Sequence, residues 1–231
     1  MSVKEYLFVL LLFFSSIHLS YGDHLSKSYN PHSIRPIDRA YVLYAKKVFR
    51  DIPLNVEQNS SCFIPGKEIS KVLVDGVKSG LLVPYQDDTL ITVMDKKQFL
   101  KNLQVESGNT EFYPSEMSLL RLVEHILFDK VTARQVYDIE SIQLIVPGKN
   151  YPYLDHTIAT FKYKDVVAYF STLPFESVCW YNRSNAAENL NWIDAFTLRL
   201  FASTIVKVDD QDNLLDTEEI YVDLEEWLSE Y

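Results

Sequence analysis

The amino-acid sequence predicts an α+β fold, with an antiparallel sheet of at least three strands and several packing helices. Between residues 136 and 171, three apolar segments follow one another with short connections, a pattern typical of an antiparallel meander. Amphipathic helical patterns come before and after these segments and do not alternate with them. This order favours an α+β domain over an alternating parallel-sheet protein.

Three helices are expected before the meander. Lys67–Gly80 has apolar residues at helical spacing, and Gly80 is suited to end the helix. Asp95 can cap a short helix that reaches Leu103. Pro114 and Ser115 are expected to open a further helix, whose apolar stripe consists of Leu119, Leu122, Val123, Ile126 and Leu127.

The expected strands are Val136–Val146, His156–Tyr163 and Asp165–Ser171, and Leu81–Met94 suggests a hairpin or two short strands. The segment Asn185–Lys207 is compatible with one long helix, broken near Ser203. A last amphipathic helix is expected at Asp216–Ser229.

The chain divides into four predicted segments. Residues 1–22 combine a short polar start, an apolar core and small residues before Asp23, which is typical of a secretory signal peptide; a short N-terminal anchor is the alternative. Residues 23–36 form a polar, flexible N-terminus. Residues 37–207 form a single domain, and residues 208–231 form an acidic C-terminal tail or helix.

The formal net charge of −10 is concentrated at the C-terminal end, because residues 208–231 contain acids and no Lys or Arg. The rest of the chain is close to neutral and has no basic footprint for nucleic acid. We therefore expect no nucleic-acid partner.

No motif predicts catalytic, cofactor-binding or metal-binding residues. The histidines have no metal-ligand spacing, and the chain lacks CxxC, GxSxG and a phosphate-binding glycine loop. Cys62 and Cys179 can form one long-range disulfide in an oxidising compartment, but sequence alone does not establish the pairing. We expect that the protein is not an enzyme and needs no cofactor.

Three stretches in order resemble one family, the gliding-motility proteins called GldN or PorN. They are Lys47–Asn59, Ile69–Asp88 and Asn185–Lys207, and Phe128–Lys130 falls where that family has an FDK triplet. The chain departs from the family at Thr172–Pro174 and in its short acidic end, so it is identified as a divergent, short member.

The resemblance implies an exported, periplasmic structural component of the type IX protein secretion and gliding motility machinery of the Bacteroidota. Members of the family assemble with a lipoprotein, GldK or PorK, into rings beneath the outer membrane. The rings connect to the periplasmic part of the GldL–GldM or PorL–PorM motor complex. The resemblance implies no enzyme activity and no cofactor.

Six residues are candidates for interface or structural roles. Arg50 and Arg199 are cations in apolar stretches, and each can pair bidentately with a carboxylate within the fold or across a subunit contact. Asn59 and Asn185 suit turns or caps, and Phe201 suits the core. Trp227 either helps the acidic tail to dock on a basic partner or belongs to a solvated terminal helix.

The alternative function is an exported binding module for cell-wall or glycan fragments. Its basis is the abundance of aromatic residues in the predicted sheet, since aromatic side chains are common at binding surfaces.

Overall fold

A computed structural model describes residues 39–105, 110–148, 155–182, 185 and 188–209. All of these belong to one compact unit of the chain. The predicted signal peptide, the segment 23–36, the last expected helix and Trp227 lie outside the described residues.

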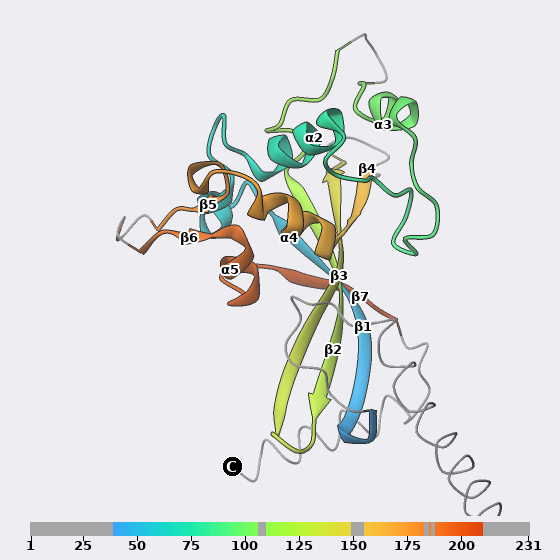
Figure 1. Cartoon of the computed structure of the whole chain (residues 1–231), viewed down its shortest axis with the longest axis vertical. Coiled ribbons are helices and arrows are strands. Elements are labelled where there is room, and N and C mark those ends of the chain that lie inside the picture. Colours follow the sequence, from blue (N-terminus) through green and yellow to red (C-terminus); the bar gives the residue numbers. More distant parts are fainter. Residues whose placement is uncertain (1–38, 106–109, 149–154, 183–184, 186–187, 210–231) are drawn as a thin grey trace, which may run out of the picture. The chain divides into compact units, whose positions relative to one another are not determined.

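The core of the fold is a five-stranded antiparallel sheet in the order β4-β3-β2-β1-β7 (Figure 1). A second, two-stranded sheet pairs β5 with β6. The strands are β1 (Val42–Pro53), β2 (Leu119–Asp129), β3 (Arg134–Val146), β4 (His156–Lys162), β5 (Cys179–Trp180), β6 (Leu190–Asn191) and β7 (Thr204–Asp209).

The α-helices pack mainly near one end of this sheet, where α4 contacts β3 and β4 and α3 contacts β4. Together with the sheet they confirm the predicted α+β class. The helices are α2 (Ile69–Ser79), α3 (Lys96–Asn102), α4 (Tyr163–Ser171) and α5 (Trp192–Thr197), with short 3-10 turns η1 (Arg39–Tyr41), η2 (Glu57–Cys62) and η3 (Phe175–Ser177).

Two helix predictions are confirmed together with their end signals. Helix α2 ends at Gly80, whose φ of 78° is the left-handed conformation that glycine adopts without a Cβ penalty. Helix α3 begins after Asp95, whose side chain accepts a hydrogen bond from the backbone N–H of Gln98 at 2.8 Å. Each of these ends depends on the residue at the end itself, so the sequence alone is enough to predict it.

The expected helix after Pro114 was wrong, because Leu119–Asp129 is the central strand β2. Leu120 and Leu122 face the helices, while Leu119 and Val123 are buried on the other face. A strand that is buried on both faces has a nearly continuous apolar sequence, and such a run also contains helical spacings.

The predicted strand Asp165–Ser171 was also wrong, since this segment belongs to α4. Its buried residues Val166, Val167 and Phe170 recur at intervals of one, three and four, which places them on one side of a helix. The strands expected at Val136–Val146 and His156–Tyr163 are confirmed as β3 and β4. No strand was predicted for Val42–Pro53, which forms β1.

The predicted long helix Asn185–Lys207 was wrong over most of its length. Among its described residues only Trp192–Thr197 is α-helical, and Thr204–Asp209 is the edge strand β7. Arg199 follows α5 with a φ of 55°, which interrupts right-handed helical geometry. The β-branched residues Thr204, Ile205, Val206 and Val208 then favour a strand.

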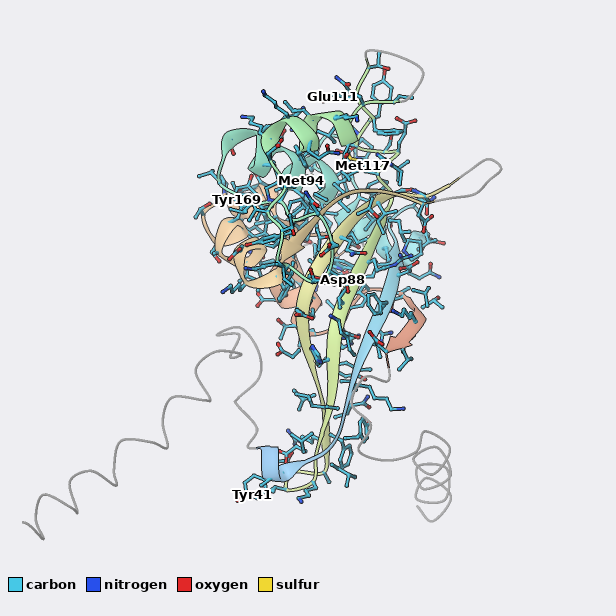
Figure 2. The ribbon with its side chains drawn as sticks, turned by 90° about the vertical axis from the view of Figure 1, so that its right-hand side faces the viewer. Tyr41, Asp88, Met94, Glu111, Met117 and Tyr169 are labelled. Atoms are coloured by element: carbon cyan, nitrogen blue, oxygen red, sulfur yellow. The ribbon has the colours of Figure 1, made fainter. Side chains whose placement is uncertain are left out.

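The expected hairpin in Leu81–Met94 is reduced to a bridge between Tyr85 and Val93. Tyr85 also bridges Thr160 of β4, so the segment runs along the edge of the main sheet. Asp88, further along this segment, lies 3.7 Å from Lys47 of β1, which brings the loop over the face of the sheet opposite α4 (Figure 2).

Gly76 of α2 lies directly against Tyr169 of α4. A Cβ at this position would lie 2.7 Å from Tyr169 Cε1 and 3.1 Å from Leu82 Cβ. We expect Gly76→Ala to lower the free energy of unfolding by about 1–2 kcal/mol, because the overpacking outweighs the gain in helix propensity.

Urea unfolding followed by circular dichroism measures this effect. Ser79→Ala, on the exposed side of the same helix, is the control and should change stability by less than about 0.5 kcal/mol. A Gly76→Ala protein more stable than the wild type would show that the helices do not need this close contact.

Candidate functional site

A buried carboxylate with two arginines lies where the helices meet the main sheet. Glu124 of β2 is 0% exposed, although it lies on the face that carries Leu120 and Leu122. Arg50 Nε donates to Glu124 Oε1 at 2.8 Å. Arg199 donates to both oxygens, from Nη1 to Oε2 at 2.8 Å and from Nη2 to Oε1 at 3.0 Å. This bidentate geometry is the strongest form of an arginine–carboxylate pair.

The side chain of Arg199 is also held by aromatic rings. Its guanidinium carbon lies 3.9 Å from the centre of the Tyr137 ring and 5.2 Å from that of Phe201. Guanidinium planes stack favourably on aromatic faces. The energetic cost of the positive φ at Arg199 is therefore offset by the contacts of its side chain with Glu124, Tyr137 and Phe201.

Asn59 provides a second link to the segment before β7. Its Nδ2 donates to the backbone carbonyls of Pro53 and Ala202, both at 2.8 Å. Its Oδ1 accepts from the Ala202 N–H at 2.7 Å. Asn59 is 0% exposed, so these partners replace water completely.

The four residues Arg50, Asn59, Glu124 and Arg199 are called the β7 anchor below. Besides its bond to Glu124, Arg50 donates to Ser203 Oγ at 3.2 Å, one residue before β7 begins. The anchor thus joins β1, β2, η2 and the segment Arg199–Ser203. It fixes the point at which the chain enters the sheet as its edge strand.

The predicted site residues have different positions in the structure. Four of them come together at the anchor: Arg50, Asn59, Arg199 and Phe201. Phe201 is buried, and the centre of its ring lies 5.4 Å from that of Phe196. Asn185 is exposed, and its N–H donates to Asn182 Oδ1 at 3.1 Å. Trp227 lies outside the described residues.

Glu124 was not among the site residues predicted from the sequence. The available signal was an acid in the middle of the apolar run 119–127, because a buried carboxylate requires a cationic or hydrogen-bonding partner. Two arginines in otherwise apolar stretches were the matching signal.

The opposite face of the sheet carries a second charged cluster around Glu140, a residue that bulges out of the β2–β3 pairing. Glu140 Oε2 lies 3.2 Å from Lys47 Nζ and 3.5 Å from His125 Nε2. The neighbouring His125 imidazole, followed by the charge of Lys47, holds the pKa of Glu140 below its ordinary value.

A carboxyl whose pKa is lower in the folded state stabilises the fold above its unfolded pKa of about 4.3 and loses that contribution as the pH falls. We therefore expect Glu140→Gln to reduce stability at about pH 5.5 and to have a much smaller effect at about pH 3. Urea unfolding of both proteins across this range measures the difference. A difference that does not change with pH would contradict the assignment.

The two cysteines are free thiols and both are buried. Cys62 Sγ donates to Asn59 O at 3.2 Å, and burial raises the pKa of Cys62 to about 12. Burial also raises the pKa of Cys179. Thiols in such surroundings stay protonated near neutral pH and are weak nucleophiles.

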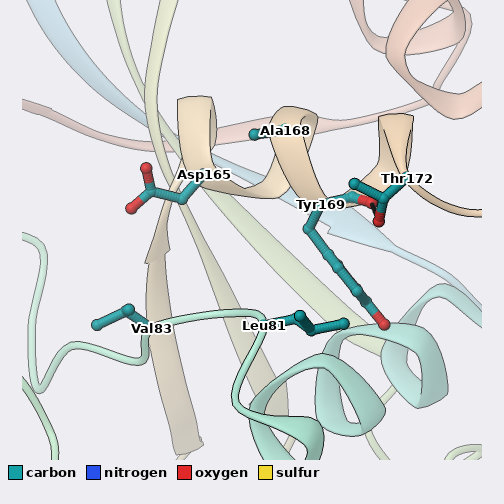
Figure 3. Close-up of a pocket in the computed structure, with 6 residues that line it drawn as sticks. All are labelled: Leu81, Val83, Asp165, Ala168, Tyr169 and Thr172. Atoms are coloured by element: carbon teal, nitrogen blue, oxygen red, sulfur yellow. Dashed lines mark hydrogen bonds between the residues drawn. The ribbon is translucent and has the colours of Figure 1, made fainter.

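One open groove lies between α4 and the segment after α2 (Figure 3). Its volume is about 370 Å³, and its lining combines three aliphatic side chains with a carboxylate, a tyrosine and a threonine. Tyr169 closes one end, where its hydroxyl donates to Val72 O at 3.3 Å. The lining residues are Leu81, Val83, Asp165, Ala168, Tyr169 and Thr172.

Within the described ranges, no group of three or more His, Cys, Asp or Glu side chains is arranged to hold a metal ion. Across the same residues, no helix combines the length and the apolar character needed to cross a membrane.

The fold and the β7 anchor define the class of protein. It is an α+β domain in which the buried charged residues of the anchor connect β1, β2 and the segment before β7. A family model described as "Gliding motility associated protein GldN" matches residues 37–229. This match covers most of the chain, so the protein belongs to the GldN family, as the sequence resemblance predicted. A comparison with curated proteins gives no match.

Proposed function

We propose that the protein is a structural subunit of the type IX protein secretion and gliding motility machinery, without enzyme activity. The observation that carries this proposal is the GldN family match over residues 37–229, a range that includes every described strand and helix. In this proposal the protein assembles with a GldK/PorK-like lipoprotein into a periplasmic ring under the outer membrane. The ring contacts the periplasmic part of the GldL–GldM or PorL–PorM motor complex.

The chain organisation of the proposal follows the sequence. Residues 1–22 direct export to the periplasm, residues 23–36 lead into the domain, and residues 37–207 form its α+β body. Residues 208–231 form the acidic end. The structure places Val208 and Asp209 in β7, so the acidic end continues directly from an edge strand.

The contacts of the β7 anchor support a structural role for Arg50, Asn59, Arg199 and Phe201. Both arginines bind a carboxylate of their own chain, and Asn59 binds backbone groups of its own chain. Asn185 is proposed for a turn or cap, and Trp227 is proposed to help the acidic end to dock on a basic partner surface.

Purification of a tagged full chain from envelope extracts tests the proposal. We expect it to elute as a large particle that contains the lipoprotein partner. A small monomer without that partner would overturn the ring assignment. A saturable titration with cell-wall glycan fragments would instead favour the alternative, an exported binding module.

A matched pair of variants separates structure from interface at Arg199. We expect Arg199→Ala to lower stability by about 2 kcal/mol, since it leaves Glu124 with one cation, while the folded molecules still enter the large particle. Lys71→Ala, which removes an exposed pair with Asp75, should change neither property. If Arg199→Ala keeps its stability but no longer assembles, Arg199 acts at a subunit contact.

A further inference from the structure

Beyond the β7 anchor, the strands β1, β2 and β3 continue as a narrow ribbon (Figure 1). Its end is called the ribbon tip below and consists of residues 41–43, around the start of β1, and residues 130–134, at the turn between β2 and β3. The Lys130 N–H donates to the Tyr41 carbonyl at 2.9 Å, so these two parts of the tip lie side by side. Figure 2 labels Tyr41 at this end.

The ribbon tip exposes three large apolar side chains. Tyr41, Leu43 and Val131 are 49%, 54% and 64% exposed. The turn that carries Val131 is held by the carboxylate of Asp129, which accepts from the Val131 N–H at 2.9 Å and from Thr132 Oγ1 at 2.8 Å. Neighbouring exposed apolar side chains on a fixed backbone are typical of a protein contact.

Two cations accompany these apolar side chains. Lys130 and Arg134 are exposed, and neither forms an ion pair with an acid in the described part of the chain. A surface that binds the ribbon tip therefore has to combine apolar groups with a negative charge.

The groove between α4 and the segment after α2 has these complementary properties (Figure 3). Leu81 and Val83 of its lining are 65% and 42% exposed. Asp165 lies across from Val83 at one end of the groove in Figure 3. Over the residues that the structure describes, the Asp165 carboxylate has no ion-pair partner. The groove thus presents exposed apolar side chains beside an acid.

The ribbon tip of one molecule does not reach the groove of the same molecule. Strand β4 pairs with β3 from Ser141 onwards, and α4 follows β4 directly. The strand from Arg134 to Ser141 spans about 20 Å, because a strand rises about 3.3 Å per residue. The tip and the groove are therefore two separate surfaces, and only a second molecule can bring them together.

We propose that the ribbon tip of one molecule docks in the groove of a second copy of this chain. Val131 packs against Val83 of the neighbouring copy, while Lys130 and Arg134 lie towards its Asp165. The contact removes exposed apolar side chains from water and brings opposite charges together. Because each molecule uses a different surface at its two contacts, repetition of this contact produces a ring or a filament. The inference deepens the proposed ring subunit, and the choice of a ring rests on that proposed function.

Cysteine cross-linking between two populations of the full chain tests this contact. One population carries Val131→Cys and the other carries Val83→Cys, and the mixture is oxidised with diamide. The native thiols of Cys62 and Cys179 are buried. We expect the mixture to form a disulfide-linked dimer with a yield at least about tenfold above that of either population alone, because docking holds the two new thiols together.

Leu198→Cys is the matched control for Val83→Cys, since Leu198 is 61% exposed and belongs neither to the ribbon tip nor to the lining of the groove. Its mixture with the Val131→Cys chain should give only the background yield. An equal yield from this control mixture would overturn the proposal. A dimer of the Val131→Cys chain alone would overturn it as well, because two tips would then meet each other.

Sedimentation velocity of charge-reversed full chains measures the contribution of the charges. Either Lys130→Glu with Arg134→Glu, or Asp165→Arg alone, should weaken self-association at least about tenfold, since like charges then face each other. All three substitutions together restore opposite charges and should return the affinity to within about threefold of the wild type. No recovery in this triple variant, with its circular dichroism unchanged, would overturn the proposed pairing.

Envelope extracts distinguish a failure of this contact from a failure of the proposed function. A wild-type chain recovered as a small monomer would overturn the ring assignment itself. If the wild type enters the large particle and the chain with Lys130→Glu and Arg134→Glu enters it equally well, the ring assignment stands and the contact between tip and groove is overturned.

Discussion

Replacing Glu124 with alanine is expected to lower the free energy of unfolding by about 3 kcal/mol or more. The carboxylate is 0% exposed, and the side chains of Arg50 and Arg199 are only 14% and 22% exposed. Without Glu124, two guanidinium groups keep their positions with little water and no counter-charge. The cost of an uncompensated charge exceeds that of the lost hydrogen bonds alone.

Chemical unfolding in urea, followed by tryptophan fluorescence, measures this loss. Glu111→Ala is the matched control, because Glu111 pairs with Lys78 at the surface, where both side chains are more than a third exposed. The control should lose less than about 1 kcal/mol. Equal losses in the two variants would contradict the assignment of Glu124 as the centre of the β7 anchor.

A triple variant, Glu124→Leu with Arg50→Met and Arg199→Met, tests whether the charges of the β7 anchor have a role besides stability. Buried ion networks are often replaced by apolar residues of similar volume at little cost in stability. We expect this triple variant to be more stable than Glu124→Ala. A reduced protection of β7 against hydrogen exchange in the triple variant would show that the charges specify the position of the edge strand.

The sequence predicted those parts of the fold that depend on local chemistry. Gly80 and Asp95 mark helix ends because their own backbone or side chain provides the ending. The error at β2 has a different origin. Burial on both faces of a central strand depends on neighbours that are distant in the sequence, and the apolar pattern alone does not show those neighbours.

The type of interaction at the candidate site could be predicted from the sequence, but the residues that bind one another could not. Arg50 and Arg199 were expected to bind a carboxylate, and they bind one within the fold. The identity of that carboxylate depends on contacts between residues far apart in the sequence. The β1–β2 pairing brings Arg50 to Glu124, 74 positions away, and the segment before β7 brings Arg199 to Glu124, 75 positions away. Asn59 was expected in a turn or cap. It does lie in η2, yet its side chain connects two segments that no local pattern associates.

Replacing Asn59 is expected to have the second large effect on the free energy of unfolding. When the replacement is the isosteric aspartate, this effect should depend on pH. In Asn59→Ala, the Pro53 carbonyl, the Ala202 carbonyl and the Ala202 N–H lose their buried partner. We expect a loss of about 3 kcal/mol at every pH, because one or more of these groups stays unsatisfied.

Asn59→Asp keeps the shape of the side chain but places carboxyl oxygens against the carbonyls of Pro53 and Ala202, which lie 2.8 Å from Nδ2 in the wild type. The ionised form is repelled there, so burial and these carbonyls raise the pKa of the new carboxyl in the folded state. A raised carboxyl pKa means that the folded protein binds more protons than the unfolded one. Stability relative to the wild type should therefore fall as the pH rises from about 4 to about 7.

Urea unfolding of the wild type, Asn59→Asp and Asn59→Ala at several pH values separates these two effects. Asn59→Asp should approach the wild type at about pH 4 and fall to or below Asn59→Ala at about pH 7, whereas the deficit of Asn59→Ala stays constant. The protonated acid regains one donor to a backbone carbonyl, while alanine has none. If Asn59→Asp matched the wild type at neutral pH, water would have to reach this side chain, and Asn59 would not be the buried connection between Pro53 and Ala202.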